Sequence, residues 1–349
     1  MSSGAGQSDM TTQLLSQLAD GYCHSGAELG KALGVSRTAI WKQLRKLEEL
    51  GLVFQSVRGR GYRLESRLEL LDARRIETTL SAASQTLLDR LDVFAHTDST
   101  NARALAYSSR PGRGYVCLAE YQQSGRGRRG RSWVSPFGRN LYLSLSWGYN
   151  EGVAGLEGLS LAVGSLLCES LEYWGLTDLE LKWPNDLLWR GRKLAGVLLE
   201  VQGDPSGQCQ LVVGLGVNFK ISGQTAGAID QPWADLDQVC KHQMQKGLAP
   251  EAKTPFPVPR IPGRNALAAK LIDRLLPLLA QFPETGFEPY RAAWQSRDCL
   301  VGRSVILSSA RETLSGIARG VNSQGALKLE IKDQIRLCYG GELSVRPVS

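Results

Sequence analysis

Residues 125–133 read GRGRRGRSW and place four arginines and three glycines within seven positions, followed by serine and tryptophan. The spacing satisfies G-x-G-x-x-G, which in dinucleotide-binding proteins follows a strand and opens a helix. Here Pro136, Gly138 and an alternating strand pattern follow, so no helix is expected. No Lys-Ser/Thr pair follows the last glycine, which excludes a Walker A loop. We therefore predict a loop that binds an anion through its guanidinium groups and closes over it through its glycines.

The positive charge of the chain is concentrated in two segments. The 349 residues carry a formal net charge of +7. Residues 31–67 contain nine Lys and Arg against three Glu, and residues 126–131 contain four Arg and no acid. Because the remainder is slightly acidic, the two segments predict two different anionic partners.

Length and composition predict a cytoplasmic protein of two or three domains. The N-terminus has no signal-peptide pattern, and the most apolar stretch, residues 156–171, is interrupted by charged residues, so no membrane span is expected. The seven cysteines form no C-x-x-C pair, which favours a reducing compartment. None of the three histidines has a neighbour at metal-ligand spacing, so no metal-ligating residues are predicted.

Residues 27–50 predict two helices joined by a turn at Gly34, and Gly51 closes the second helix. Two short strand-like runs flank the sequence RGRG at 58–61, which predicts a basic hairpin. Helix, turn, helix and hairpin together indicate a winged helix-turn-helix that reads the major groove. The alternative is an interaction domain with a solvated basic face. The residues expected to contact DNA are Ser36, Arg37, Thr38, Lys42, Arg45, Arg58 and Arg60.

Several other segments place small, amide or charged side chains at the ends of strand-like runs. They are HTDSTNARAL (96–105), LKWPND (181–186), WRGRKLAGVLLE (189–200) and LVVGLGVNF (211–219). Each alone could be a turn. Together they predict a site for a polar ligand.

The combined motifs resemble the bifunctional bacterial biotin protein ligases, the BirA family, which are also repressors of the biotin operon. The motifs are STN (99–101), EYQQSGRGRRGRSW (120–133), SPFGRNLYLS (135–144), KWPND (182–186), RKLAGVLLE (192–200) and GLGVN (214–218). The resemblance covers essentially the whole chain and implies an α+β multidomain fold. It implies a winged helix-turn-helix in residues 1–67, an α/β catalytic domain with a mixed sheet, related to class II synthetases, in 68–297, and a small SH3-like β-barrel in 298–349.

The resemblance also implies a reaction and its partners. Biotin and ATP, with Mg²⁺, would give biotinyl-5′-AMP, and a lysine of the biotin carboxyl carrier protein of acetyl-CoA carboxylase would then accept the biotin. Operator DNA and a ligand-dependent homodimer are the other implied partners. Two alternatives remain open: a biotin-sensing transcription factor without ligase activity, and a lipoate ligase. A polar STN segment favours biotin, because hydroxyls and amides can pair with the ureido group.

The resemblance assigns roles to individual residues. Those implied in catalysis are Arg128, Lys182, Asp186 and Lys193. Those implied in binding biotin are Ser99, Thr100, Asn101, Gln122, Arg126, Gly127, Arg128, Lys193 and Gly196. Those implied in binding the adenylate are Arg126, Arg128, Arg129, Arg131, Trp133, Asn185, Asn218 and Trp233.

Two segments depart from the family or from regular structure. Residues 219–233 match the adenylate-covering loop poorly, and residues 242–264 form a proline-rich insertion without an assigned role. A helix is expected directly after the insertion, with a kink at Pro277. Glycine-separated alternating runs after residue 303 predict the strands of the C-terminal unit.

Overall fold

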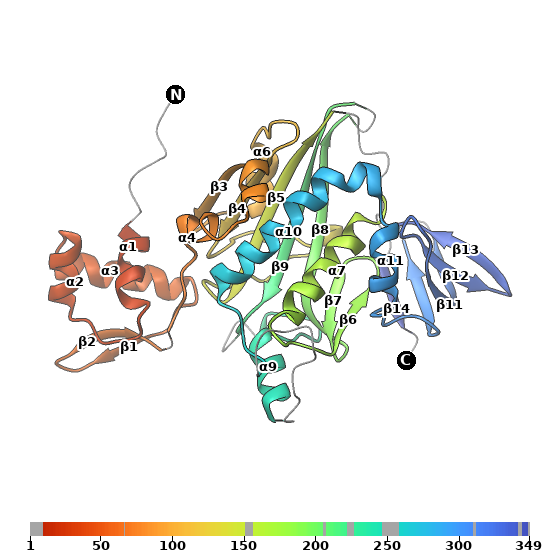
Figure 1. Ribbon diagram of the computed structural model, residues 1–349. Coiled ribbons are helices and arrows are strands. Elements are labelled where there is room, and N and C mark those ends of the chain that lie inside the picture. Colours follow the sequence, from red (N-terminus) through yellow and green to blue (C-terminus); the bar gives the residue numbers. More distant parts are fainter. Residues whose placement is uncertain are drawn as a thin grey trace.

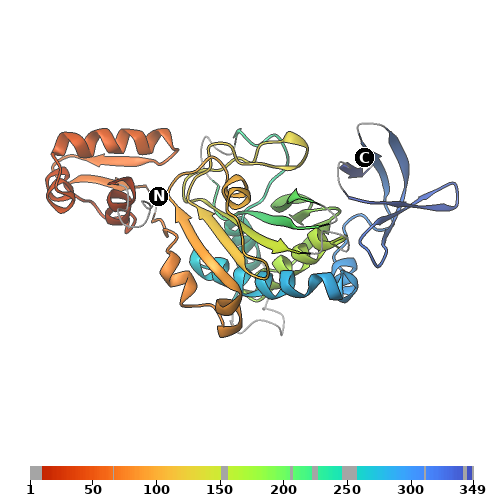
Figure 2. The same ribbon diagram turned by 90° about the horizontal axis from the view of Figure 1, so that it is seen from above.

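Three units follow one another along the chain, with the winged helix and the C-terminal sheet on opposite sides of a central sheet (Figure 1, Figure 2). The computed structural model describes residues 10–65, 67–150, 156–204, 207–221, 227–245, 258–309, 312–340 and 344–347. No helix among these residues is long and apolar enough to cross a membrane.

The first unit is the expected winged helix-turn-helix. Its elements are α1 (Met10–Leu18), α2 (Gly26–Leu33), α3 (Arg37–Glu49), β1 (Phe54–Val57) and β2 (Gly61–Leu64). Gly34 ends α2 with a φ of 67°, and Ser36 caps α3 by accepting a hydrogen bond from Ala39 N at 3.2 Å. Helix α1 was not expected from the sequence. It contributes Leu14, Leu15 and Leu18 to the core formed with α3.

The central unit is built on a seven-stranded mixed sheet, as predicted. Its strands are β3 (Leu88–Phe94), β4 (Gly114–Ala119), β5 (Asn140–Tyr149), β6 (Leu179–Lys182), β7 (Asp186–Trp189), β8 (Arg192–Gly203) and β9 (Cys209–Asn218). The order across the sheet is β3-β4-β5-β9-β8-β7-β6. Only the β3–β4 pair is parallel among these neighbours.

Helices cover the two faces of this sheet unequally. The helices on the first face and beside it are α4 (Ala73–Glu77), α5 (Ala82–Leu87), α7 (Leu159–Glu172), α10 (Arg264–Thr285) and α11 (Glu288–Gln295). The other face carries α6 (Thr100–Ala106), and Figure 2 shows α6 and α10 on opposite sides. The α6 face also carries the segment with Trp133, and the residues predicted to bind biotin lie on this face.

The C-terminal unit is a five-stranded antiparallel sheet. Its strands are β10 (Ser304–Ser308), β11 (Thr313–Val321), β12 (Leu327–Ile331), β13 (Gln334–Cys338) and β14 (Ser344–Pro347), in the order β13-β12-β11-β10-β14. The predicted antiparallel strands are thus confirmed. Their core is continuous with that of the central unit through α11 and Trp294.

The helix expected after the insertion is present. It is α10, which runs through both Pro277 and Pro283, and the kink expected at Pro277 stays a prediction. Helix α9 (Leu236–Gln245) begins before the predicted insertion and includes its first residues, 242–245. Residues 246–257 of the insertion lie outside the described residues.

Candidate active site

A cluster of buried, hydrogen-bonded polar side chains lies where the N-terminus of α6 meets β5. Gln122 Oε1 accepts hydrogen bonds from Thr100 N at 2.8 Å and from Thr100 Oγ1 at 3.1 Å. Ser144 Oγ lies 2.7 Å from Thr100 Oγ1 and 2.6 Å from Asn101 Oδ1. All of these side chains are buried. The predicted residues of the STN motif are thus brought together with Gln122.

Local sequence explains how this polar cluster forms. Ser99 caps α6 by accepting a hydrogen bond from Ala102 N at 3.4 Å, so Thr100 and Asn101 fall in the first helical turn. Gly214 of β9 lies beneath Asn101: a Cβ there would lie 2.1 Å from Asn101 Oδ1. Glycine is therefore required at this position for the amide to rest on the sheet.

Glu200 joins the polar cluster to the arginine-glycine loop. Its carboxylate accepts a hydrogen bond from Asn101 Nδ2 at 2.7 Å and pairs with Arg126 Nη1 at 3.2 Å. Sequence reasoning missed both Glu200 and Ser144. Glu200 could have been recognised as a carboxylate that follows the apolar residues Val197–Leu199. Ser144 gave no such indication, because it lies within a strand between two leucines.

The arginine-glycine loop encloses a cavity of about 620 Å³. The cavity is lined by residues 123–132 together with Leu198 and Glu200. A single 3-10 turn, Arg128–Gly130, replaces the helix that a dinucleotide fingerprint would open. Arg129 adopts a φ of 59°, and Trp133 N donates to Gly125 O at 2.8 Å to close the loop at its base. The prediction of a glycine-supported loop rather than a helix start is confirmed.

The four arginines of this loop differ in their surroundings. Arg126, Arg129 and Arg131 are exposed, whereas Arg128 is half-buried and donates from Nη1 to Asn185 Oδ1 at 3.2 Å. Burial lowers the pKa of Arg128 from its ordinary value, the nearby Asp186 carboxylate opposes that shift, and Arg129 adds to it. An anion in the cavity would relieve both the desolvation and the repulsion.

Lys193 and Asp186 form an ion pair beside the loop. Lys193 Nζ lies 2.8 Å from Asp186 Oδ1 and 5.4 Å from the centre of the Trp133 ring. The backbone of Lys193 is bound on both sides, since its N donates to Pro232 O and its O accepts from Ala234 N, each at 2.9 Å. Trp233 lies between those two residues, and its backbone pairs with Lys193 in a parallel bridge.

Trp133 lies on a floor of glycines. A Cβ on Gly216 would lie 2.6 Å from Trp133 Cε2, and one on Gly196 would lie 3.3 Å from Cζ3. These two glycines are direct neighbours on β9 and β8. Asn218 reaches the same region through hydrogen bonds from Nδ2 to Ala234 O at 3.1 Å and to Lys193 O at 3.4 Å. The predicted adenylate residues Trp133, Asn218 and Trp233 therefore surround Lys193.

Lys182 differs from the other predicted catalytic residues in the contacts of its side chain. It is half-buried at the end of β6, where its backbone pairs with Asp186 across the hairpin. Within the described part of the chain, its ammonium group makes no hydrogen bond or ion pair. Its assignment to a phosphate rests on the resemblance alone.

Models of three protein families match this chain. The biotin/lipoate A/B protein ligase family matches residues 93–218, an HTH domain matches 11–63, and the biotin protein ligase C terminal domain matches 300–346. The bifunctional ligase/repressor BirA of Salmonella typhimurium is 40% identical over 333 residues, which cover 95% of this chain and 96% of the relative. The Escherichia coli BirA is 38% identical, with 96% of each chain covered.

The chain belongs to the bifunctional biotin protein ligase family. Among solved structures, the biotin protein ligase from Aquifex aeolicus in complex with biotin and ATP matches with a TM-score of 0.59 and 24% identity. The match covers 75% of this chain and all of the other. That similarity supports the fold of the ligase described above.

The helix-turn-helix of this ligase presents the predicted DNA-binding surface. The side chains of Arg37, Thr38, Lys42 and Arg45 are exposed on α3, and Arg58 and Arg60 are exposed in the turn between β1 and β2. Two of the predicted DNA-binding residues also make contacts within the winged helix itself. Ser36 Oγ is engaged as the cap of α3, and Arg45 pairs with Glu48 at 3.2 Å while lying 5.4 Å from the ring centre of the exposed Trp41.

Proposed function

We propose that this ligase activates biotin with ATP to biotinyl-5′-AMP and transfers the biotin to a lysine of biotin carboxyl carrier protein. The observation that supports the proposal is that Glu200 contacts both the buried polar cluster, through Asn101, and Arg126 in the lining of the arginine-glycine cavity. The cluster supplies hydroxyl and amide groups for a ureido ring, and the cavity supplies cations for phosphates. Relatives with full-length similarity are named as ligases of the same kind.

The proposed chemistry follows from charge. An oxygen of the biotin carboxylate attacks the α-phosphorus of ATP, and pyrophosphate leaves. Both reactants are anions, so their approach requires nearby cations, which Arg128 and Lys193 supply. In the second step a carrier lysine amine attacks the acyl carbon and AMP leaves. Asp186 holds the Lys193 ammonium at 2.8 Å and so orients it for the carboxylate of biotin.

The remaining proposed contacts are with three parts of the ligand: the biotin head group, the biotin chain and the adenylate. Ser99, Thr100, Asn101 and Gln122 would bind the biotin head group. The backbone at Gly127 and Gly196 would lie along the biotin chain. Trp133, Asn185 and Trp233, with the loop arginines, would cover the adenylate and exclude water, which protects the mixed anhydride from hydrolysis.

We propose Mg²⁺ as the metal that accompanies ATP, whose phosphates would supply ligands to it. The described residues contain no group of three or more His, Cys, Asp or Glu side chains that could hold a metal ion. The two carboxylates beside the proposed site, Asp186 and Glu200, are already paired with Lys193 and Arg126. We therefore assign no metal ligand and derive no step through a metal.

One experiment separates this proposal from its two rivals. The protein is incubated with ATP, biotin and purified carrier protein, and the carrier mass is measured after tryptic digestion. Biotin on a specific lysine supports the ligase. Adenylate binding without transfer would favour a biotin sensor, and lipoyl transfer in the parallel reaction with lipoate would favour a lipoate ligase.

We further propose that the adenylate-bound protein is a homodimer that binds operator DNA. Strand β8 supports this, because only residues 192–196 pair with β7 and the stretch toward Gly203 has no described strand on that side. Such an edge can pair with a second copy. Two winged helices on a two-fold axis would then read two half-sites.

The test is a DNA-binding titration on a two-fold site from a biotin synthesis promoter. Affinity should be higher with biotinyl-5′-AMP than without, and it should fall with salt at a log–log slope of about −0.9 for each phosphate neutralised. Equal affinity in both conditions, matching that for random DNA, would refute the repressor function and leave the ligase function standing.

We also propose a cytoplasmic location. All seven cysteines are free of disulfides. Such thiols fit a reducing compartment.

A further inference from the structure

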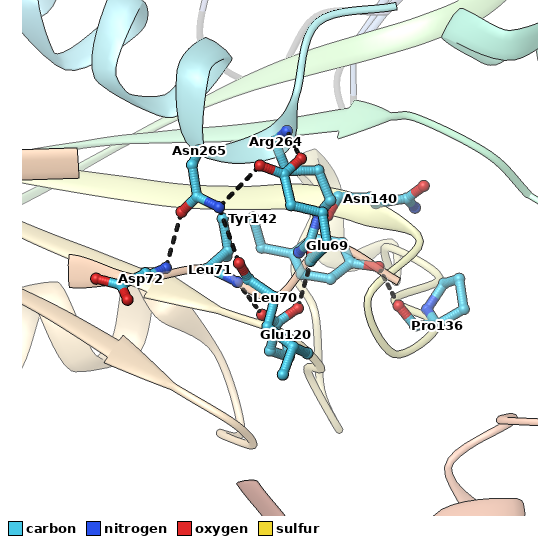
Figure 3. A network of polar contacts seen from close by, with 10 residues as sticks. All are labelled: Glu69, Leu70, Leu71, Asp72, Glu120, Pro136, Asn140, Tyr142, Arg264 and Asn265. Carbon is cyan, nitrogen blue, oxygen red and sulfur yellow. Dashed lines mark hydrogen bonds and ion pairs between the residues drawn. The ribbon is translucent and has the colours of Figure 1, made fainter. Parts of the chain in front are cut away.

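The connector between the winged helix and the central unit, residues 68–72, is bound through hydrogen bonds between side chains and its backbone and not through pairing with a β-strand. Residues 69–72 cross from the first unit to α4, and each contributes a backbone group to the network in Figure 3. Asn265 binds two of these groups: Nδ2 donates to Leu70 O and Oδ1 accepts from Asp72 N, each at 2.8 Å. Glu120 Oε1 accepts from Leu71 N at 2.5 Å, and Arg264 Nη1 donates to Glu69 O at 2.8 Å.

Arg264 is the centre of this network. Its guanidinium lies 2.6 Å from Glu120 Oε2, and both side chains are only 5% exposed. Its Nε also donates to Asn140 O at 3.0 Å, at the start of β5. One planar group therefore joins the connector, the end of β4 and the start of β5. A planar fork with several donors suits this task better than an ammonium group.

Glu120 links the same guanidinium to the proposed biotin site. It is the residue directly after β4 and lies two positions before Gln122. Its backbone O accepts from Gly138 N at 2.9 Å, which closes the base of the segment that carries the arginine-glycine loop. Gln122 Nε2 donates to Ser135 Oγ across that segment at 3.1 Å. A shift of Glu120 would consequently move Gln122 and the loop with it.

At the N-terminal end of the connector, Leu68 contacts the winged helix. Leu68 N donates to Ala19 O at 3.0 Å, and the Leu68 side chain packs in the winged-helix core with Phe137 of the central unit. A Cβ on Gly138 would lie 2.5 Å from Leu68 Cδ1, so this contact is close. The orientation of the DNA-binding unit therefore depends on the residues that bind residues 68–72, together with the packing of Phe137 and Tyr121 against its core.

We propose that Arg264 is a positioning residue that fixes Gln122 for biotin and, through the same guanidinium, fixes the connector on which the DNA-binding unit is mounted. The inference rests on the proposed function, because its readouts are biotin use and operator binding. Arg264 itself is not assigned a contact with biotin, ATP or DNA. It acts through Glu120 on one side and through the Glu69 carbonyl on the other.

Three variants of the full-length protein test this role. Arg264→Lys keeps the positive charge beside Glu120 but loses the fork. Asn265→Ala removes contacts to the connector alone. Arg297→Lys is the matched control, since Arg297, just after α11, makes a two-pronged pair with Glu172 at the end of α7, at 2.9 and 2.8 Å, away from the connector. Thermal melts establish that each variant is folded.

Arg264→Lys should raise the KM for biotin about tenfold while changing kcat less than about twofold, because the biotin site is displaced but the cations remain. With saturating biotinyl-5′-AMP, both Arg264→Lys and Asn265→Ala should weaken operator binding about tenfold, since a loosened connector must be ordered again on DNA. Asn265→Ala should leave the KM for biotin unchanged. Arg297→Lys should change neither quantity.

The outcomes separate failure of this inference from failure of the proposed function. If the unaltered protein neither biotinylates carrier nor binds the operator, the proposed function is wrong. If it does both and Arg264→Lys behaves as Arg297→Lys does, the positioning role is refuted. Should Arg264→Lys not fold, Glu120→Gln retains the volume and must produce the same rise in KM, or the inference fails.

Discussion

Replacing Gly214 by alanine should disable the proposed biotin site without removing any polar group. The added Cβ would lie 2.1 Å from Asn101 Oδ1 and 2.8 Å from its Cγ, so the amide must move. That movement breaks the hydrogen bond from Ser144 at 2.6 Å and the one to Glu200 at 2.7 Å. A neutral hydrogen bond contributes about 1 kcal/mol and one to a charged group about 2 kcal/mol. Because the Glu200 side chain is 26% exposed, we discount the sum to about 2 kcal/mol.

The assay is calorimetric titration of biotin into the purified protein. The loss of about 2 kcal/mol is a loss of folding stability, because both bonds lie within the protein; loss of the proposed contact between Asn101 and biotin, about 1 kcal/mol, corresponds to roughly fivefold weaker binding. Gly340→Ala is the control, because a Cβ at that position meets nothing within 4 Å. In an Asn101→Ala background, Gly214→Ala should cost little more, since the clashing group is gone. Biotin affinity within twofold of the unaltered protein, or an equal cost in both backgrounds, would refute the placement of the biotin site.

The remaining predictions concern the loop, the ion pair and the thiols. Arg128→Ala should release the adenylate roughly tenfold faster, since it removes one charge-assisted contact; unchanged retention in a stopped-flow displacement assay would exclude Arg128 from the anion site. Lys193→Ala should slow adenylate formation, measured by pyrophosphate release, but leave the salt slope of DNA binding unchanged; full activity would contradict the role of Lys193. At pH 8 iodoacetamide should leave Cys117 and Cys299 unmodified in the native protein, because burial raises the pKa of each to about 12. Mass spectrometry of peptides checks this last prediction, and labelling of either thiol before unfolding would contradict it.

The sequence by itself determined features that depend on neighbouring residues. Gly34 and Ser36 specify the turn and the start of α3, because a left-handed residue and a capping hydroxyl act within one helical turn. The same locality made the hairpin at 58–61 and the strand after the arginine-glycine loop predictable. The site motifs were found because each lies at the end of an element with a recognisable local pattern.

Tertiary structure decided which of these motifs meet and what joins them. Glu200 reaches Asn101 across 99 positions, and Asp72 binds Asn265 across 193. No local pattern encodes such pairs, because a carboxylate or an amide has the same local preference whether it faces solvent or a buried partner. Only the order of strands β5, β9 and β8 places Ser144, Gly214 and Glu200 on one face. The fold therefore brings separate motifs together on one face of the sheet, and it alone led us to propose that Arg264 positions both Gln122 and the connector to the DNA-binding unit.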